Sequence, residues 1–465
     1  MLCIIPKRRG GYMAKLWQKD HTLNELIERF TVGTDYLLDV QLVPSDCMAS
    51  LAHAEMLGKI GILTNEEVAE LRTGLLSILS DAENQSFHIR REDEDCHTAI
   101  ENRLTAELGE VGKKIHTGRS RNDQVIAALR LYARSRLSDI ARSLIELAKA
   151  LTDFAERFQD IPMPGRTHMQ IAMPSSVGLW AASFAELILD DGTLIDTAYV
   201  LNNRSPLGSA ASYGVPLPLD RELVARKLGF TGIQNNVLAV NNSRGKLESI
   251  ILDALDQVGL TLGKFAEDLI IFSMPEFGYF SLPPDLCSGS SIMPQKRNPD
   301  GLELLRARSG TLHGAAEQVK SIIRSLPSGY NRDFQETKEP FLRGLQVAYE
   351  CIQIARLTID RLEVHPDRLR AAFTPEIFAT DAAIEKVRDG MSFRDAYREV
   401  GKSLSSLVDR DPDGTVAQRT ASGTAGNLKL ESVFAEIAAR TRDMESEERR
   451  VQEALSSLAG GPVRL

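Results

Sequence analysis

The feature that most constrains the fold is a run of about 36 residues, from Gln124 to Gln159, that contains no proline or glycine. Apolar side chains recur along it at spacings of three and four residues, which is the period of an amphipathic helix. At 1.5 Å per residue such a helix would be roughly 54 Å long, far longer than the helices of ordinary mixed domains. We therefore expect a fold built around long helical rods.

Four further runs of the same kind follow, at residues 175–201, 243–273, 301–325 and 340–362. Signals for strands are weak throughout, so the chain is predicted to be all-α with a central bundle of five long helices. Rods of this length readily pack side by side with copies of themselves. We therefore also expect a symmetric oligomer.

The lengths of the helical patterns, and the glycines and prolines that interrupt them, divide the chain into three predicted helical domains. Residues 1–118 contain shorter helical patterns, residues 119–371 contain the long bundle, and residues 372–465 form a smaller domain of shorter helices. The short apolar run at the start precedes its basic residues and is too short for a secretory signal. We interpret residues 1–12 as a disordered extension or the product of an upstream start codon, with Met13 opening the folded part.

Composition excludes several classes of protein. Of the 465 residues, 26% are charged and 43% are hydrophobic, without a long uncharged apolar run, which describes a soluble globular protein with no membrane-spanning segment. A net charge of −9 argues against a general nucleic-acid surface. Five scattered cysteines without a CxxC pair predict reduced thiols in a cytoplasmic protein.

Four polar segments lie at the ends of the long runs. They are HTGRSRND at 116–123, PGRTHMQ at 164–170, GSSIMPQKRNPD at 289–300 and SGYNRDFQETK at 328–338. Within an acidic protein they gather hydroxyls, amides and cations, a set that suits a small ligand with several carboxylates. The cations are Arg119, Arg121, Arg166, Lys296, Arg297, Arg332 and Lys338.

Two of these segments also have a plainer structural interpretation. Ser120 and Asp123 have the spacing of a capping box at the start of a helix, so capping and function are equally open for the first segment. In the second, a lone His168 is more often a structural histidine than a catalyst. Pro164 and Gly165 there could simply form a turn.

The third segment favours an anion site beneath a mobile loop. Asn298 followed by Pro299 matches the N-cap and first position of a helix, whose free amides would point towards the loop. Gly289 and the two serines after it would let the loop move, and Lys296 lies within reach of the helix end. A flexible linker would contain glycine and serine as well.

The segment at 289–300 resembles the signature of the fumarase/aspartase superfamily, whose members eliminate a group from a succinyl substrate to release fumarate or a close relative. Within it, HTGRSRNDQ at 116–124 is similar to the argininosuccinate lyases. The similarity extends over most of the chain in the family's order, through Arg29–Thr31, Asp39 with Leu42, Ser50–Ala54, Asp93–Thr98, Pro206–Ser209, Tyr330–Lys338 and Ala379–Asp381.

The resemblance implies β-elimination of L-argininosuccinate to L-arginine and fumarate through an aci-carboxylate intermediate, without a metal or other cofactor. It implies Ser290 as general base and His168, paired to Glu303, as general acid, although an alternative assignment makes His168 the base. Lys296 and Asn298 would stabilise the aci-carboxylate. The substrate-binding residues that it implies are Ser120, Arg121, Asn122 and Thr167 for the succinyl part, and Tyr330, Gln335 and Lys338 for the arginine part and its carboxylates.

The resemblance further implies a homotetramer whose central helices form a twenty-helix bundle, with each active site drawing segments from three chains. The chain departs from the family at Arg166, where tyrosine is common, and at Ile171–Pro174, where Arg-Ala-Gln-Pro is common. Ala49 stands where glycine is favoured before the serine matching Ser50. These departures, Met173 among them, concern substrate preference and leave the reaction class unchanged.

The same motifs are compatible with other functions. Adenylosuccinate lyase, aspartase or an aminopolycarboxylate lyase would share most of the motifs and would also release fumarate. A non-catalytic, crystallin-like protein would share the scaffold, although the presence of Ser290, His168 and Lys296 favours an enzyme.

One short stretch has the residue types of a metal site. It comprises Asp93, Asp95, Cys96 and His97. Because no second cluster completes a ligand set, a solvated, capped turn is the favoured interpretation.

Overall fold

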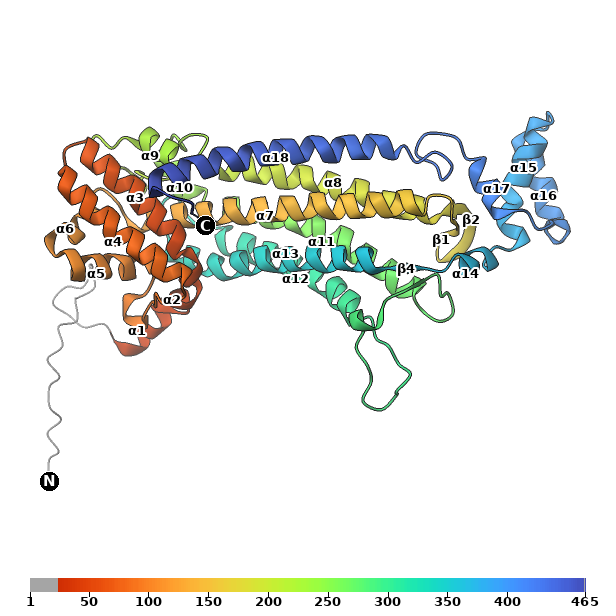
Figure 1. Ribbon diagram of the computed structural model, residues 1–465, viewed down its shortest axis with the longest axis horizontal. Helices are drawn as coiled ribbons and strands as arrows, with labels where there is room; N and C mark the ends of the chain where they lie inside the picture. The colour runs from red at the N-terminus through yellow and green to blue at the C-terminus, as the bar shows by residue number, and fades with distance from the viewer. Residues whose placement is uncertain (1–23, 464) are drawn as a thin grey trace, which may run out of the picture.

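The computed structural model describes residues 24–463 and 465, which form an elongated helical body (Figure 1). The predicted extension at 1–12 and the start at Met13 lie outside these residues. The prediction of an all-α fold is confirmed, because the strands of the described part are few and short. They are β1 Pro162–Thr167, β2 Gln170–Ser176, β3 Phe280–Ser281 and β4 Glu363–Val364.

The five long helices predicted from periodicity are present, each within a few residues of its expected bounds. They are α7 Arg121–Arg157, α8 Val177–Asn202, α11 Lys246–Phe272, α12 Asp300–Ile323 and α13 Lys338–Arg361. They run side by side along the body: α7 packs on α8 and α13, and α12 packs on α11 and α13.

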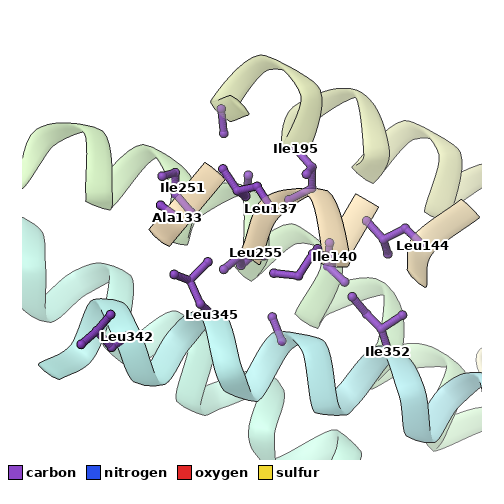
Figure 2. Close-up of a cluster of buried hydrophobic side chains, with 14 of the residues drawn as sticks. Ala133, Leu137, Ile140, Leu144, Ile195, Ile251, Leu255, Leu342, Leu345 and Ile352 are labelled. Atoms are coloured by element: carbon purple, nitrogen blue, oxygen red, sulfur yellow. The ribbon is translucent and has the colours of Figure 1, made fainter. Parts of the chain in front are cut away.

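The apolar stripes of these helices meet in one core. Figure 2 shows side chains of α7, α8, α11 and α13 converging, among them Leu137 and Ile140 of α7, Leu255 of α11 and Leu345 of α13. These four side chains are fully buried. Burial of a Leu or Ile side chain stabilises a fold by about 1.5–3 kcal/mol, so the stripe that predicts each helix also holds the bundle together.

Shorter helices cover the two ends of the bundle (Figure 1). At one end lie α1 Glu25–Val32, α2 Asp35–Leu38, η1 Asp39–Leu42, α3 Val43–Lys59, α4 Asn65–Glu83, η2 Arg91–Asp93, α5 Cys96–Leu108, α6 Glu110–Lys113, η3 Lys114–His116, α9 Arg221–Lys227 and α10 Val237–Asn242. At the other end lie α14 Pro366–Ala371, η6 Pro375–Phe378, α15 Ala379–Arg388, α16 Phe393–Lys402, η7 Leu404–Ser406 and α17 Pro412–Ala417. Two short 3₁₀ helices, η4 Pro284–Leu286 and η5 Arg332–Thr337, precede α12 and α13.

The expectation of shorter helices after residue 372 is wrong for the last element. α18, Leu430–Ala459, has 30 residues and returns along the bundle to pack on α7, α8 and α3. Only its two ends bury apolar side chains, because the middle at 440–453 is densely charged. The charged middle interrupts the apolar period, which hides a long helix from a periodicity argument. The domain boundary at 371 therefore stays a prediction.

Between α7 and α8 the chain forms a β-hairpin, which the weak strand signals did not predict. Its strands pair antiparallel, and His168 and Met169 form the two-residue turn. Pro164 and Gly165 lie within β1, so their interpretation as a turn is wrong. Glycine is required at 165 because a Cβ there would lie 2.7 Å from the carbonyl oxygen of Met173 on β2.

Two simpler expectations can be checked on the described residues. The cysteines among them, Cys47, Cys96, Cys287 and Cys351, are free thiols, and Cys3 lies outside. None of the helices in residues 24–463 combines the length and the apolar character needed to cross a membrane.

Candidate active site

The residues predicted to bind substrate or catalyse the reaction fall into three groups in the structure. One surrounds the start of α7, the second is the hairpin tip beyond the end of α7, and the third is the loop before α12. α7 has 37 residues, which at 1.5 Å per residue separates its ends by about 55 Å. The first two groups therefore lie at opposite ends of the bundle (Figure 1).

The first group begins with a capping box at the start of α7. The Ser120 hydroxyl accepts a hydrogen bond from the amide of Asn122 at 3.3 Å, and the Asp123 carboxylate accepts one from the amide of Ser120 at 2.9 Å. The second oxygen of Asp123 accepts from the amides of Gly208 and Ala210. The capping interpretation is thus confirmed, and the same box holds the 206–210 stretch against the start of α7.

A cavity of about 60 Å³ opens beside this helix start. It brings together five residues that the sequence assigned to substrate binding, although they come from distant parts of the chain. They are Arg121, Asn122, Tyr330, Gln335 and Lys338. We call this cavity the α7 pocket.

Lys338 lies at the base of the α7 pocket and is only 2% exposed. Its Nζ pairs with Asp39 Oδ1 at 2.7 Å and with Asp35 Oδ2 at 3.0 Å. Burial alone would lower the pKa of Lys338, but the carboxylates of Asp39 and Asp35 raise it above its ordinary value. The ammonium is therefore permanently charged, and Asp39 and Asp35 already neutralise it.

Arg121 projects into the α7 pocket from the other side. Its guanidinium pairs with Glu94 at 3.0 Å and with Asp95 at 3.4 Å, and it also contacts the hydroxyl of Thr98. Burial alone would raise the pKa of Asp95, but Arg121 and His97 hold it below its ordinary value. The wall here carries the ionised carboxylate of Asp95 beside the guanidinium of Arg121.

The pocket is completed by residues that sequence reasoning did not assign. Arg244 is buried, and its guanidinium carbon lies 5.6 Å from the ring centroids of both Tyr330 and Phe334. Asp35, which pairs with Lys338, also lines the pocket. The one local signal for Arg244 is its position at the end of a polar run, Asn241-Asn-Ser-Arg244, immediately before a long apolar helix.

The segment at 328–338 is tied to the first helix of the described chain. Gln335 donates to the carbonyl of Thr31 at 3.1 Å, and Arg332 donates to the same carbonyl at 2.6 Å. Tyr330 is 39% exposed at the mouth of the pocket. Arg121, Arg244, Arg332 and Lys338 thus face Asp35, Glu94 and Asp95, a mixture of charges that matches a ligand carrying both an ammonium and carboxylates.

The second group is the tip of the β1–β2 hairpin. Thr167 and His168 are exposed there, and His168 and Met169 both adopt positive φ angles, 52° and 62°. Within residues 24–463 the imidazole of His168 makes no hydrogen bond or ion pair. Its predicted partner Glu303 lies in the first turn of α12, just after the third group, and the two side chains do not pair within one chain.

The third group is the loop between η4 and α12, which stands out from the body of the molecule (Figure 1). Its base is closed by paired backbone hydrogen bonds between Ser288 and Asn298, at 3.1 and 2.9 Å. The hydroxyl oxygen of Ser290 accepts from the amides of Ile292 at 3.4 Å and Met293 at 3.1 Å. Donors aimed at this oxygen favour its negatively charged form. Lys296 is exposed on the same loop.

The start of α12 corrects one detail of the sequence analysis. The helix begins at Asp300 with Pro299 at the N-cap, so Asn298 does not cap it. The Asn298 amide instead donates to the hydroxyl of Ser288 and the carbonyl of Gly289, both at 3.3 Å, which closes the loop. No side-chain cap occupies the start of α12 in the described structure.

The stretch from Asp93 to His97 forms a capped turn, but the expectation that this turn is solvated is wrong, because all five of its residues are buried. Asp93 pairs with Arg90, and Asp95 accepts from the Thr98 amide at 2.8 Å as the N-cap of α5. Cys96 and His97 do approach Asp39, with their donor atoms within 4.8 Å of one another. Lys338 already compensates the charge of Asp39, and His97 pairs with Asp46 at 3.0 Å.

The sequence is similar to proteins of known name over nearly its whole length. Residues 18–314 match the family described as Lyase. A protein named argininosuccinate lyase from Thermotoga neapolitana is 44% identical over 85% of this chain and 99% of its own length. Proteins of the same name from Sorangium cellulosum and Phocaeicola vulgatus are 43% and 41% identical, covering 90% and 91% of this chain and 97% and 95% of their own.

Solved structures share the fold. A crystal structure of EDDS lyase in complex with formate has a TM-score of 0.78 at 21% identity and covers 93% of this chain and 94% of its own. Fumarate lyase from Mesorhizobium sp. BNC1 has a TM-score of 0.66 at 19% identity, covering 94% of this chain and 99% of its own. At this level of identity the similarity concerns the helical architecture alone.

Proposed function

The chain belongs to the argininosuccinate lyase family of the fumarase/aspartase superfamily, and we propose from this that it cleaves L-argininosuccinate to L-arginine and fumarate. The observation that carries the proposal is the α7 pocket, where five residues assigned to the substrate line one cavity although up to 217 positions separate Arg121 from Lys338. Its mixture of cations and carboxylates suits argininosuccinate, which carries an ammonium, a guanidinium and three carboxylates.

The first chemical step removes a proton from the carbon next to a succinyl carboxylate. We assign this step to Ser290, because the amides of residues 292 and 293 donate to its hydroxyl oxygen and favour the alkoxide. Lys296 on the same loop and the uncapped first turn of α12 would stabilise the doubly charged aci-carboxylate. His168 would then protonate the departing guanidino nitrogen as general acid.

Complete sites require more than one copy of the chain. In one chain His168 and the α7 pocket lie at opposite ends of the bundle, and the described hydrogen bonds of Ser290 reach neither, whereas general acid and base must both lie within hydrogen-bonding reach of the substrate. Apolar side chains that are 38–58% exposed line the long helices: Leu187, Leu194, Leu260, Leu304, Ile354 and Leu357. Such faces suit burial against further copies. We therefore propose a homotetramer with a twenty-helix core and sites composed from three chains, acting in the cytoplasm.

The proposed function is tested by incubating the purified protein with argininosuccinate and identifying the products. We expect arginine and fumarate in equal amounts, and no comparable fumarate release from adenylosuccinate, aspartate or ethylenediamine-disuccinate. Release from ethylenediamine-disuccinate alone would assign the chain to an aminopolycarboxylate lyase. The absence of any turnover would favour a non-catalytic, crystallin-like role.

The role of Ser290 is tested by Ser290→Ala, with Ser291→Ala as the matched control on the same loop. Loss of the base should lower kcat by about 10²- to 10⁴-fold while the fold and substrate binding remain, because a positioned base contributes that much to the rate. The control should retain most of its turnover. Near-normal turnover by Ser290→Ala would reject Ser290 as the base.

A further inference from the structure

The turn that presents His168 is held in an unusual backbone conformation. His168 and Met169 both have positive φ, at 52° and 62°, although neither is glycine. Two-residue hairpin turns of this kind strongly favour Asn-Gly, because side chains crowd the left-handed region. Strained turns of this kind persist only where neighbouring groups hold them.

Arg166 is the side chain that holds this turn. Its guanidinium donates to the carbonyl oxygen of Met169 at 3.3 Å, which joins the two sides of the turn beneath His168. The hairpin register shifts between Gly165 and Arg166, where Gly165 pairs with Met173 and Arg166 with Ile171. Such bulges redirect side chains, and here the extra residue is Ala172 of β2, opposite the step from Gly165 to Arg166.

The same guanidinium attaches the turn to the rigid body of the molecule. It donates to the hydroxyl of Tyr279 at 3.3 Å, and its central carbon lies 4.9 Å from the ring centroid of Phe277. Tyr279 is 2% exposed and packs against Phe272 and Phe277. One end of the Arg166 guanidinium thus binds the turn, and the other contacts the aromatic cluster that follows α11.

We propose that Arg166 is a positioning residue for His168: by binding the Met169 carbonyl and the Tyr279 hydroxyl together, it sets the direction in which the imidazole leaves the hairpin. This inference rests on the proposed function, in which His168 takes part in turnover. A lysine in place of Arg166 would reach only one of the two acceptors, because it lacks the planar fork.

The test compares Arg166→Met, Arg166→Lys and Tyr279→Phe with a control at the same end of the bundle, Arg157→Met, whose guanidinium stacks on Phe158. Displacing a catalytic group by about 1 Å can cost about 10²-fold in rate. We therefore expect Arg166→Met to lower kcat by about 10- to 100-fold with KM changed less than about twofold. The kcat values of Arg166→Lys and Tyr279→Phe should lie between those of Arg166→Met and wild type. The kcat of Arg157→Met should equal that of wild type.

A double mutant separates this inference from the proposed function. In a His168→Gln background, Arg166→Met should have no further effect, because there is no imidazole left to position. Unchanged kcat in Arg166→Met, together with a damaged His168→Gln enzyme, would overturn the inference and leave the proposed function standing. A raised KM at normal kcat in Arg166→Met would also overturn the inference, because it would indicate that Arg166 binds the substrate. Full turnover by His168→Gln would instead refute the role of His168 itself.

Discussion

At the scale of single residues, two buried ionisable side chains differ in whether the fold supplies a partner of opposite charge. Lys338 is enclosed with two carboxylates, Asp39 and Asp35, and keeps its charge. Asp191 on α8 is 7% exposed, has no cation partner in the described structure, and its Oδ2 accepts no hydrogen bond there. Burial raises the pKa of Asp191 to about 6, so ionising it at neutral pH costs stability.

Replacing Asp191 by asparagine should therefore stabilise the protein in a pH-dependent way. The pKa is 3.8 when unfolded and about 6 when folded, so the carboxyl is neutral in both states below pH 3.8, and its cost to stability grows between pH 3.8 and about 6 and is complete above that. The size of the pKa shift limits the stability gained by Asp191→Asn to about 3 kcal/mol. Partial solvation of the carboxyl reduces the expected gain to about 1–2 kcal/mol.

Urea unfolding of Asp191→Asn and wild type at pH 8 and pH 4.5 measures this gain. The exposed neighbour Asp190→Asn is the control and should change stability little at either pH. A gain for Asp191→Asn that is equal at both pH values would contradict the assignment.

At the scale of elements, the β1–β2 hairpin is the smallest piece of structure on which a proposed catalytic group depends. Two non-glycine residues in the left-handed region cost about 1–2 kcal/mol each, which the pairing of β1 with β2 and the contacts of Arg166 must offset. The pairing depends on a close approach, since the missing Cβ of Gly165 leaves room for the Met173 carbonyl. A substitution that disturbs the pairing of β1 with β2 should therefore also change the conformation of the turn.

We expect Gly165→Ala to separate the strands and lower kcat by at least about tenfold, because the turn would lose its geometry. The bundle core does not include this position, so the melting temperature should fall by only a few degrees. Thermal unfolding and steady-state kinetics measure the two effects. Gly401→Ala, where an added Cβ meets nothing within 4 Å, is the control and should retain full activity. Normal kcat for Gly165→Ala would show that the turn does not depend on strand pairing.

At the scale of the whole molecule, the length of α7 decides how sites can form. The α7 pocket and His168 lie about 55 Å apart at the two ends of a 37-residue helix. A rigid rod cannot bend to bring them together. Adjacent antiparallel copies of the rod would instead place the end of one beside the start of another.

Mixing two inactive variants tests this arrangement. His168→Ala and Ser290→Ala, refolded together, should recover at least about a tenth of wild-type turnover, since some sites would combine an intact hairpin with an intact loop. Ser290→Ala mixed with Lys296→Met is the control and should recover nothing, because both changes lie on one loop. If oligomers shown to contain both His168→Ala and Ser290→Ala chains remain inactive, sites shared between chains are excluded.

Patterns that repeat within a segment could be read from the sequence. The five long helices follow from apolar residues at a local period, and a helix satisfies its backbone hydrogen bonds within its own segment. The Ser120–Asp123 capping box is likewise a matter of adjacent residues. Local patterns failed where a competing contact decided the outcome. Asn298 closes its loop instead of capping α12, and the charged middle of α18 hides its helical period.

The sequence by itself determined the helical class, the bundle and the short motifs to which we assign the chemistry, because each depends on residues close together in the chain. Only the tertiary structure decided that Arg244 and Asp35 complete the α7 pocket and that carboxylates already balance the charge of Lys338 there. It alone also placed His168 on a strained turn that Arg166 holds. Such contacts join residues up to hundreds of positions apart. They depend on how rigid helices pack, which no local period encodes.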